Sequence, residues 1–260
     1  MKADAKAVGR IGLNIDGDVA TVVLDNPSKR NAMTETMWRD LATTMRELAH
    51  APIRAVVVRG ADGHFAAGAD IGEFPAIRMT RADAVRYHMQ TVGHALSAIE
   101  ECPHTVIAAI EGNCIGGGLE IALACDLRLA RPGSVYGIPA GRLGFALSPT
   151  ELRLVFDTVN RTTASALLLE GAMLDAEQAL AAGILTRIND ALDAEVQATI
   201  ARVRAMSAIA TREHKEWMRR LAADRSGRGI ALNQEEFAQA MAFAERDDYR
   251  DRVNGFLKRR

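Results

Sequence analysis

The first third of the chain alternates short β-branched apolar runs with turn-forming residues. The runs Gly12–Ile15 and Ala20–Leu24 flank Asp16-Gly17-Asp18, a combination that predicts a β-hairpin. After a break at an Asn-Pro-Ser turn, Thr34 opens a stretch that predicts a helix to about Ala49. The chain therefore begins with a hairpin followed by a helix.

Strands and helices alternate through the middle of the chain. Arg54–Arg59 and Thr105–Ile110 are apolar runs long enough for buried strands, and helical patterns over Ile71–Ile77 and Arg81–Ile99 lie between them. A helix and three short strands are predicted next, at Leu119–Ala124, Leu127–Ala130, Ser134–Ile138 and Leu185–Ile188. Such alternation implies βαβ-type crossovers and a largely parallel sheet, so the predicted fold class is mixed α/β.

The pattern becomes mostly helical from about Thr162 onward. We therefore expect a mixed α/β core over residues 1–203 and a helical C-terminal region over residues 204–260. A chain of 260 residues is long enough for one large domain with a smaller appendage.

Composition and charge exclude several classes of protein. The 32 basic and 33 acidic residues leave a net charge of -1, so the basic excess of a nucleic-acid-binding protein is missing. The longest apolar runs, such as Val106–Ile110, are far shorter than the ~18 residues of a membrane span. The first ten residues contain no apolar segment of a secretory signal. We expect a soluble cytoplasmic protein that binds neither nucleic acid nor membrane.

The cysteines and histidines do not form a metal-binding or disulfide pattern. Cys102, Cys114 and Cys125 contain no C-x-x-C pair, and no H-E-x-x-H is present. His88 and His94 share a helical stretch, and we expect both to be solvated or half-buried. No metal site is predicted.

Two glycine-rich turns each follow a predicted strand, at Phe65–Asp70 and Gly112–Gly118. One interpretation is close packing, since glycine tolerates positive φ. The other is that backbone N–H groups are exposed at a helix N-terminus, where the helix dipole favours negative charge. Neither turn matches the G-x-G-x-x-G or G-x-x-x-x-G-K-[ST] pattern, so neither nicotinamide nor nucleoside triphosphate binding is supported.

Glu120 lies three residues beyond Gly117, so on a helix that begins there the two residues share one face. This places a carboxylate one turn from exposed N–H donors. Such a glutamate is either part of a functional site beside those donors or an ordinary first-turn residue stabilised by the helix dipole or serving as a cap.

Five blocks of the sequence together resemble the crotonase superfamily, which is the enoyl-CoA hydratase/isomerase superfamily. The resemblance covers nearly the whole chain. The blocks are NPSKRNA at Asn26–Ala32, FAAGADI at Phe65–Ile71, IAAIEG at Ile107–Gly112, GGGLEIALACD at Gly116–Asp126 and GFLKRR at Gly255–Arg260.

The resemblance implies a crotonase-like spiral of ββα units with a helical C-terminal region used for trimerisation. It implies a homotrimer or dimer of trimers, and an acyl-CoA substrate in which coenzyme A is part of the substrate, with no other cofactor. The backbone N–H groups of Ala69 and Gly117 would form an oxyanion hole for the thioester carbonyl, and Glu120 would act as the acid–base group. One oxyanion-hole donor is typically worth ~3–4 kcal/mol.

The resemblance also implies substrate-binding positions. Lys29 and Arg30 match a loop that lies along coenzyme A, although both are also explained as solvated charges. Asp70 matches a position that frames the substrate channel, and it is also explained as a turn or cap residue. The full set of implied substrate-binding residues is Ser28, Lys29, Arg30, Ala32, Ala67, Asp70, Ile71, Gly116, Pro139, Ala140 and Leu143.

The sequence departs from the hydratase pattern at one catalytic position. Hydratases of the superfamily hold water with two carboxylates, and the second follows a proline in a G-x-P-E segment. Here the segment is Gly137-Ile138-Pro139-Ala140, so an alanine stands at that position. The loss of a general acid or base typically costs ~10²–10⁴ in rate.

Several hypotheses about the function are therefore compatible with the sequence. The first is a hydratase-type enzyme that works with Glu120. The alternatives are another enolate reaction on acyl-CoA, such as isomerisation, decarboxylation or thioester hydrolysis, and a catalytically impaired acyl-CoA-binding homologue. Tyr136, Arg142 and Glu151 are the nearby side chains that would supply a replacement group. We expect Tyr136 to pack in its strand and the other two to be solvated.

The acyl pocket is expected along the helical stretch Phe74–Met89. Its apolar residues are Pro75, Ile77, Met79 and Met89. Methionine is an adaptable gap filler, which suits such a pocket. The arginines of this stretch are expected to face solvent, with the alternative that one of them meets a substrate carboxylate; they are Arg78, Arg81 and Arg86.

Overall fold

The computed structural model of the chain describes residues 9–223, 241 and 246–258. The chain divides into two units, Met1–Val203 and Arg204–Arg260. Every residue of the candidate site lies in the first unit.

A six-stranded sheet organises the first unit, in the order β1-β2-β3-β4-β6-β8. The β1–β2 pair is the predicted antiparallel hairpin, with Ile15 opposite Ala20, and the other neighbours are parallel as predicted. The strands are β1 (Arg10–Asp16), β2 (Val19–Asp25), β3 (Ala55–Gly60), β4 (Thr105–Ile110), β6 (Leu127–Ala130) and β8 (Arg187–Ile188).

A second, parallel sheet of two strands lies beside the first. It pairs β5 (Asn113–Ile115) with β7 (Val135–Gly137). The strand β5 was not predicted, because it has three residues inside a glycine-rich turn and its pairing partner is distant in sequence. The chain thus passes from the main sheet to the small sheet after β4, and again after β6.

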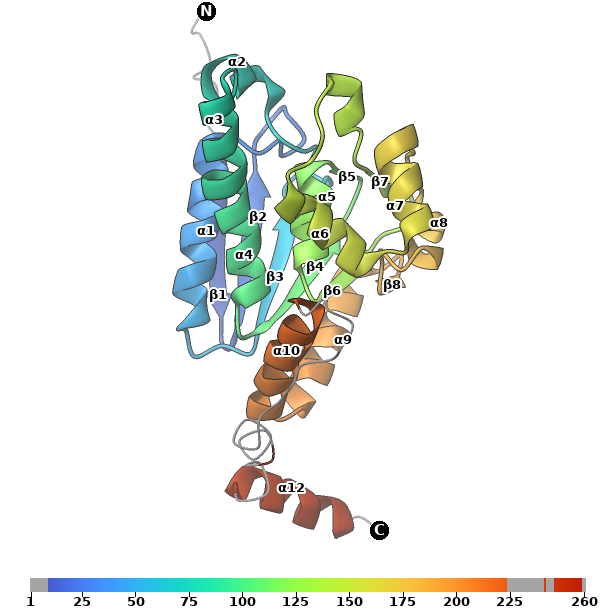
Figure 1. The fold of residues 1–260 in the computed structure, drawn as a ribbon. Helices are drawn as coiled ribbons and strands as arrows, with labels where there is room; N and C mark the ends of the chain where they lie inside the picture. Colours follow the sequence, from blue (N-terminus) through green and yellow to red (C-terminus); the bar gives the residue numbers. More distant parts are fainter. Residues whose placement is uncertain (1–8, 224–240, 242–245, 259–260) are drawn as a thin grey trace, which may run out of the picture. The chain divides into compact units, whose positions relative to one another are not determined.

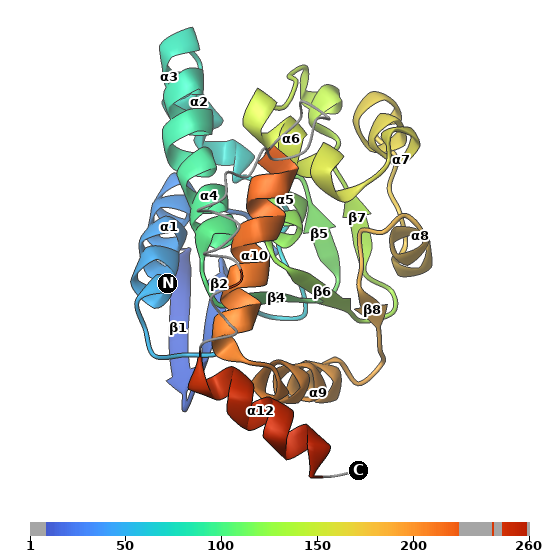
Figure 2. The same ribbon diagram turned by 60° about the horizontal axis from the view of Figure 1, so that its bottom comes forward.

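Alternate residues of the central strands belong to two separate hydrophobic cores on opposite faces of the sheet. Val56 and Val58 of β3 belong to the larger core, whereas Ala55 and Val57 point to the opposite face. The larger core is covered by α1 (Glu35–Ala49), α4 (Gly93–Glu101), α5 (Gly117–Ala124) and α6 (Pro149–Thr158) (Figure 1). The opposite face is covered by α9 (Leu192–Ala205) (Figure 2). The central parallel strands β3 and β4 are therefore buried on both faces, as parallel strands usually are, whereas the edge strand β1 is largely exposed.

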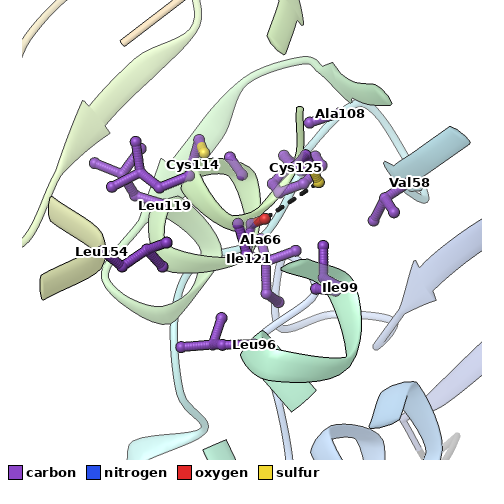
Figure 3. Close-up of a cluster of buried hydrophobic side chains, with 14 of the residues drawn as sticks. Val58, Ala66, Leu96, Ile99, Ala108, Cys114, Leu119, Ile121, Cys125 and Leu154 are labelled. Carbon is purple, nitrogen blue, oxygen red and sulfur yellow. Dashed lines mark hydrogen bonds between the residues drawn. The ribbon is translucent and has the colours of Figure 1, made fainter. Parts of the chain in front are cut away.

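The helices α4, α5 and α6 meet in the larger core. Leu96 and Ile99 from α4 pack near Ile121 of α5, and Leu154 of α6 closes the cluster (Figure 3). The Sγ of Cys125 donates to the Ile121 carbonyl oxygen at 3.2 Å (Figure 3). The three cysteines are free and buried. This packing places α6 against α5, the helix that carries Glu120.

The predicted helix Arg81–Ile99 is interrupted. The structure has α3 (Arg81–Arg86), a π-helical segment η2 (Tyr87–Val92) and then α4. The Gly93 N–H donates to the His88 carbonyl, and a Cβ on Gly93 would lie only 2.9 Å from that oxygen. Glycine thus permits the wider turn, and π-helical turns are frequent at functional sites.

The remaining elements are short in the first unit and longer in the second. In the part of the chain that the structure describes, no helix is both long enough and apolar enough to span a bilayer. The first unit also contains η1 (Ile71–Glu73), α2 (Phe74–Ile77), η3 (Ala140–Leu143), α7 (Arg161–Ser165), η4 (Ala166–Glu170) and α8 (Ala176–Ala181), and the second contains α10 (Ala208–Ala223) and α12 (Asp247–Leu257).

Candidate active site

The two glycine-rich turns bring the Ala69 and Gly117 amides to one point. Gly68 has φ +98°, and a Cβ there would lie 3.0 Å from the Ile115 carbonyl oxygen and 3.7 Å from the Gly117 nitrogen. A Cβ on Gly117 would in turn lie 3.8 Å from the Ala69 nitrogen. Glycine is required at these turns because the two backbone segments approach each other directly.

Both amides lack a backbone acceptor among the described residues. The bridge between Met33 and Ala69 uses the Gly68 carbonyl and the Asp70 N–H, and it leaves the Ala69 N–H unused. Gly117 is the first residue of α5, where helical N–H groups have no partner within the helix. Two adjacent unpaired N–H groups at a helix N-terminus form a site for a negatively charged oxygen.

Glu120 projects from the first turn of α5 beside these amides. The side chain is 4% exposed, and it lines the same cavity as Ala69 and Gly117. Burial raises the pKa of Glu120 well above its usual range, and the nearby charge of Glu151 raises that pKa further. Because the raised pKa favours the protonated form, Glu120 is suited to hold a proton that it later donates.

Glu151 also lines this cavity, which contradicts the expectation that it is solvated. The residue is 1% exposed. Its Oε2 accepts from the Ser148 N–H at 2.7 Å, which forms part of a capping box at the start of α6. Its Oε1 lies 2.7 Å from Nδ1 of His88, which comes from the π-helical segment. Two carboxyl groups from α5 and α6 thus face one cavity.

The cavity has a volume of about 120 Å³ and largely aromatic and aliphatic walls. Trp38 of α1, Phe74 of α2, Tyr87 of η2 and Phe145 contribute rings. Of the predicted site residues, the lining contains Ala67, Ala69, Ile71, Gly116, Gly117, Glu120, Pro139, Ala140 and Leu143. Residues that lie far apart in the sequence, from Trp38 to Glu151, therefore meet here.

Five predicted binding residues lie outside the lining of this cavity: Ser28, Lys29, Arg30, Ala32 and Asp70. Lys29 Nζ forms an ion pair with Asp70 Oδ2 at 2.5 Å. Asp70 also accepts from the Gly72 N–H, which supports the interpretation of Asp70 as a cap residue.

Buried asparagines shape the loop that carries Lys29 and Arg30. Asn31 Nδ2 donates to the Ala61 and His64 carbonyls, each at 2.8 Å. Ser28, Arg30 and Asn31 all have positive φ, at 64°, 50° and 59°. Non-glycine residues adopt this conformation only where surrounding contacts hold it. The loop is therefore fixed in one shape, with the side chains of Lys29 and Arg30 exposed or half-exposed.

The stretch Phe74–Met89 contributes to the cavity wall, as expected, but the four apolar residues named for the pocket do not line it: Pro75, Ile77, Met79 and Met89. Ile77 packs against the larger core instead, and Met79 and Met89 are 73% and 63% exposed. Arg86 pairs with Glu35, whereas Arg78 lines the cavity.

The other two candidate replacements for the missing carboxylate lie elsewhere. Tyr136 is fully buried in β7, as expected. Arg142 is exposed and donates to the Gly171 carbonyl at 3.1 Å. Among the described residues, no group of three or more His, Cys, Asp or Glu side chains is arranged to hold a metal ion.

Comparison with known proteins agrees with this geometry. A family model described as enoyl-CoA hydratase/isomerase matches residues 14–260. The chain belongs to this family. A solved enoyl-CoA hydratase/carnithine racemase from Magnetospirillum magneticum superposes with a TM-score of 0.90 at 34% identity, over 98% of this chain and 94% of that one. The fold of the present chain is therefore the crotonase-like spiral, including a C-terminal helical region.

Two further relatives carry different family activities in their names. A solved enoyl-CoA hydratase/isomerase from Marinobacter aquaeolei has a TM-score of 0.84 at 28% identity, covering 96% of this chain and 97% of that one. The mitochondrial Delta(3,5)-Delta(2,4)-dienoyl-CoA isomerase of Mus musculus is 32% identical over 193 residues, which are 70% of this chain and 59% of the isomerase. Family membership supports an enzyme acting on acyl-CoA but does not select hydration or isomerisation.

Several cavity residues were missed by sequence reasoning. No motif marks Trp38 or Phe145 as a cavity residue. His88 is half-buried, which agrees with the expectation that it is solvated or half-buried, but its place in the cavity wall was not predicted. The Ser148–Glu151 spacing is a capping-box pattern, which by itself explains a glutamate at an exposed helix start. No local signal distinguished these residues, because their position depends on how α1, η2, α5 and α6 come together around one cavity.

Proposed function

We propose that the protein hydrates a trans-2-enoyl-CoA thioester, using Glu120 and Glu151 as its two acid–base carboxyls. The observation that carries this proposal is the burial of Glu151 in the cavity of Glu120, in a chain with Ala140 at the position expected for the second carboxylate. The Glu151 carboxyl comes from α6 and not from the segment after Pro139, so it reaches the cavity by a different route.

The thioester carbonyl oxygen binds to the N–H groups of Ala69 and Gly117. These donors are fixed by the backbone, so they need no reorganisation when negative charge develops on that oxygen. The enolate formed at this stage is therefore stabilised more than the neutral thioester, which is the requirement for a faster reaction.

The two carboxyls divide the proton transfers between them. Glu151 accepts a proton from a water molecule whose oxygen adds to C3 of the enoyl group. Glu120, which holds its proton because its pKa is raised, donates that proton to C2. The product is the 3-hydroxyacyl thioester, and the proton on Glu151 then returns to Glu120 through water.

The remaining groups bind the coenzyme A portion and orient Glu151. Lys29 and Arg30 supply positive charge for its phosphates from the fixed loop, beside Ser28 and Ala32. A near-neutral protein must meet an anionic ligand with such local groups. His88 contacts Oε1 of Glu151 and orients the carboxyl.

We also propose that the helical unit 204–260 assembles the chain into a homotrimer or a dimer of trimers. The proposal rests on family membership. Size-exclusion chromatography with light scattering measures the assembly directly. A monomeric mass at all protein concentrations would contradict it.

Isomerisation of an enoyl-CoA double bond is a second candidate. It is favoured by the similarity to a dienoyl-CoA isomerase and by the presence of carboxyls able to remove and return a proton. In that reaction, one carboxyl removes a proton from C2 of a 3-enoyl thioester, and the resulting dienolate is protonated at C4 to give the 2-enoyl thioester. No water adds.

Chromatography of reaction products tests the proposal. Purified protein is incubated with a short and a medium trans-2-enoyl-CoA, and separately with a cis-3-enoyl-CoA and a malonyl-type thioester. We expect 3-hydroxyacyl-CoA from the first pair. The variants Glu120→Gln and Glu151→Gln should each lower kcat by ~10²–10⁴, whereas Glu101→Gln, an exposed residue of α4, should not.

Each other result identifies an alternative. Absence of 3-hydroxyacyl-CoA above the buffer control at high enzyme concentration would refute hydration. Conversion of only the 3-enoyl thioester would select isomerisation, and release of CO₂ or of free coenzyme A would select decarboxylation or thioester hydrolysis. Tight thioester binding without any turnover would indicate an acyl-CoA-binding homologue.

A further inference from the structure

Arg78 places a positive charge in the wall of the cavity that contains Glu120 and Glu151. Its backbone N–H donates to the Phe74 carbonyl at 3.1 Å at the end of α2. Its guanidinium carbon lies 4.2 Å from the ring centre of Phe74 and 4.0 Å from that of Phe145. Aromatic rings from two separate segments thus hold the guanidinium in place.

The rings of Phe74 and Phe145 are nearly perpendicular to each other, at 80°, so the guanidinium can lie flat against at most one of them. The five N–H donors of an arginine point outward in the plane of the group, in a fork that matches a carboxylate. In the described part of the chain, the Arg78 side chain has no ion pair and no hydrogen bond. By contrast, Arg86 pairs with Glu35, and Arg153 pairs with Glu100 at 2.7 Å.

Neither Glu120 nor Glu151 forms an ion pair with the Arg78 guanidinium. The two carboxylate oxygens of Glu151 contact the Ser148 N–H and His88 Nδ1. Glu151 influences Arg78 electrostatically, but the two side chains lie beyond ion-pair distance. Burial lowers the pKa of the Arg78 guanidinium, which remains charged at neutral pH because an arginine pKa begins so high. A partly desolvated charge of this kind is usually satisfied by an opposite charge.

We propose that Arg78 binds a carboxylate at the far end of the acyl group, so that the substrate is the thioester of a dicarboxylic acid. The inference rests on the proposed function in one respect: the acyl group enters this cavity when the thioester carbonyl binds at Ala69 and Gly117. The rings of Phe74 and Phe145 then enclose the methylene groups between the two ends, and Arg78 receives the charged end in a bidentate pair.

The coenzyme A phosphates are the competing anion for Arg78, and two matched thioesters separate the possibilities. 4-Carboxybutanoyl-CoA and 5-methylhexanoyl-CoA have the same chain length and an end of the same shape, which is charged in the first and apolar in the second. Both are saturated, so neither is hydrated and binding is measured without turnover. Isothermal titration calorimetry gives Kd for each with the full-length wild type, with Arg78→Gln and with Arg81→Gln.

We expect the wild type to bind the carboxylate thioester about tenfold more tightly than its apolar match. Arg78→Gln should weaken carboxylate binding about 100-fold and change binding of the apolar thioester by no more than about twofold, because only the first loses a desolvated charge pair. Arg81 is exposed three residues along the chain, so Arg81→Gln should leave both Kd values unchanged. Arg78→Lys, which keeps the charge without the planar fork, should lie in between.

Three results would overturn the inference. The first is that the wild type binds the apolar thioester more tightly than the carboxylate thioester. The second is that Arg78→Gln weakens binding of both thioesters equally. The third applies if Arg78→Gln does not fold, and it is that Arg78→Lys leaves the Kd for the carboxylate thioester unchanged. Equal weakening would assign Arg78 to the coenzyme A portion or to packing. The hydration assay is separate: hydration with no preference for a carboxylate refutes only the role of Arg78, whereas a carboxylate preference in binding without hydration refutes only the proposed reaction.

Discussion

Replacement of Glu120 by glutamine should change how the stability of the protein depends on pH. The Glu120 side chain is 4% exposed, and burial together with the charge of Glu151 raises its pKa in the folded state. In the unfolded chain, the pKa of a glutamate is ~4.3. Glutamine has nearly the same shape and carries no ionisable proton, so it removes the titration and keeps the packing.

Whether the free energy of unfolding rises or falls with pH depends on whether the folded or the unfolded state binds more protons. Below the unfolded pKa, Glu120 is protonated in both states and pH has no effect through this group. As pH rises above that value, the unfolded chain loses the proton while the folded protein keeps it, so the free energy of unfolding of the wild type falls. The fall is up to about 1.4 kcal/mol per pH unit and ends when the raised folded pKa is passed. For a chain of this size, each kcal/mol lowers Tm by about 2–4 °C.

Urea denaturation at one protein concentration between pH 4 and pH 8 measures this effect. The difference in unfolding free energy between Glu120→Gln and wild type should be smallest at pH 4 and grow as pH rises. Glu151→Gln removes the like charge, so the corresponding growth should be smaller in that background. Glu101→Gln, at an exposed site, should run parallel to wild type. Parallel curves for Glu120→Gln and wild type across the whole range would refute the assignment of a buried, protonated Glu120.

Two further predictions follow from the geometry around α5. A Cβ on Gly118 would lie 2.4 Å from the Ala66 carbonyl oxygen, so Gly118→Ala should lower the free energy of unfolding by about 3 kcal/mol. Gly133 has φ +82°, but no atom lies within 4 Å of a Cβ added there, so Gly133→Ala should lower the free energy of unfolding by only about 1 kcal/mol. Equal urea midpoints for the two variants would contradict the close approach of Gly118 to the Ala66 carbonyl oxygen. Ala140 lines the cavity, so Ala140→Glu in a Glu151→Gln background should restore hydration by at least about tenfold; an unchanged product yield would mean that position 140 does not face the reacting water.

Local patterns in the sequence predicted the framework that positions the amides. The hairpin, the helix from Thr34 and the strands β3 and β4 were predicted from apolar periodicity within each segment, and α1 begins as expected with the Thr34 hydroxyl accepting from the Met37 N–H at 3.1 Å. Their signals lie within a few residues of one another. The three-residue β5 and the break in the helix at Tyr87 were missed, because their hydrogen bonds depend on distant partners or on one wide turn.

The sequence by itself determined the family, the fold class and the position of Glu120 one turn beyond Gly117, because each is set by short blocks of adjacent residues. It also showed that an alanine replaces the second carboxylate. Only the tertiary structure decided what stands beside Glu120. Glu151, His88 and Arg78 belong to three segments whose local patterns are those of exposed helices, and the tertiary fold brings these segments to one cavity beside the first turn of α5. Burial by such packing, and not sequence spacing, turns these ordinary polar residues into a candidate site.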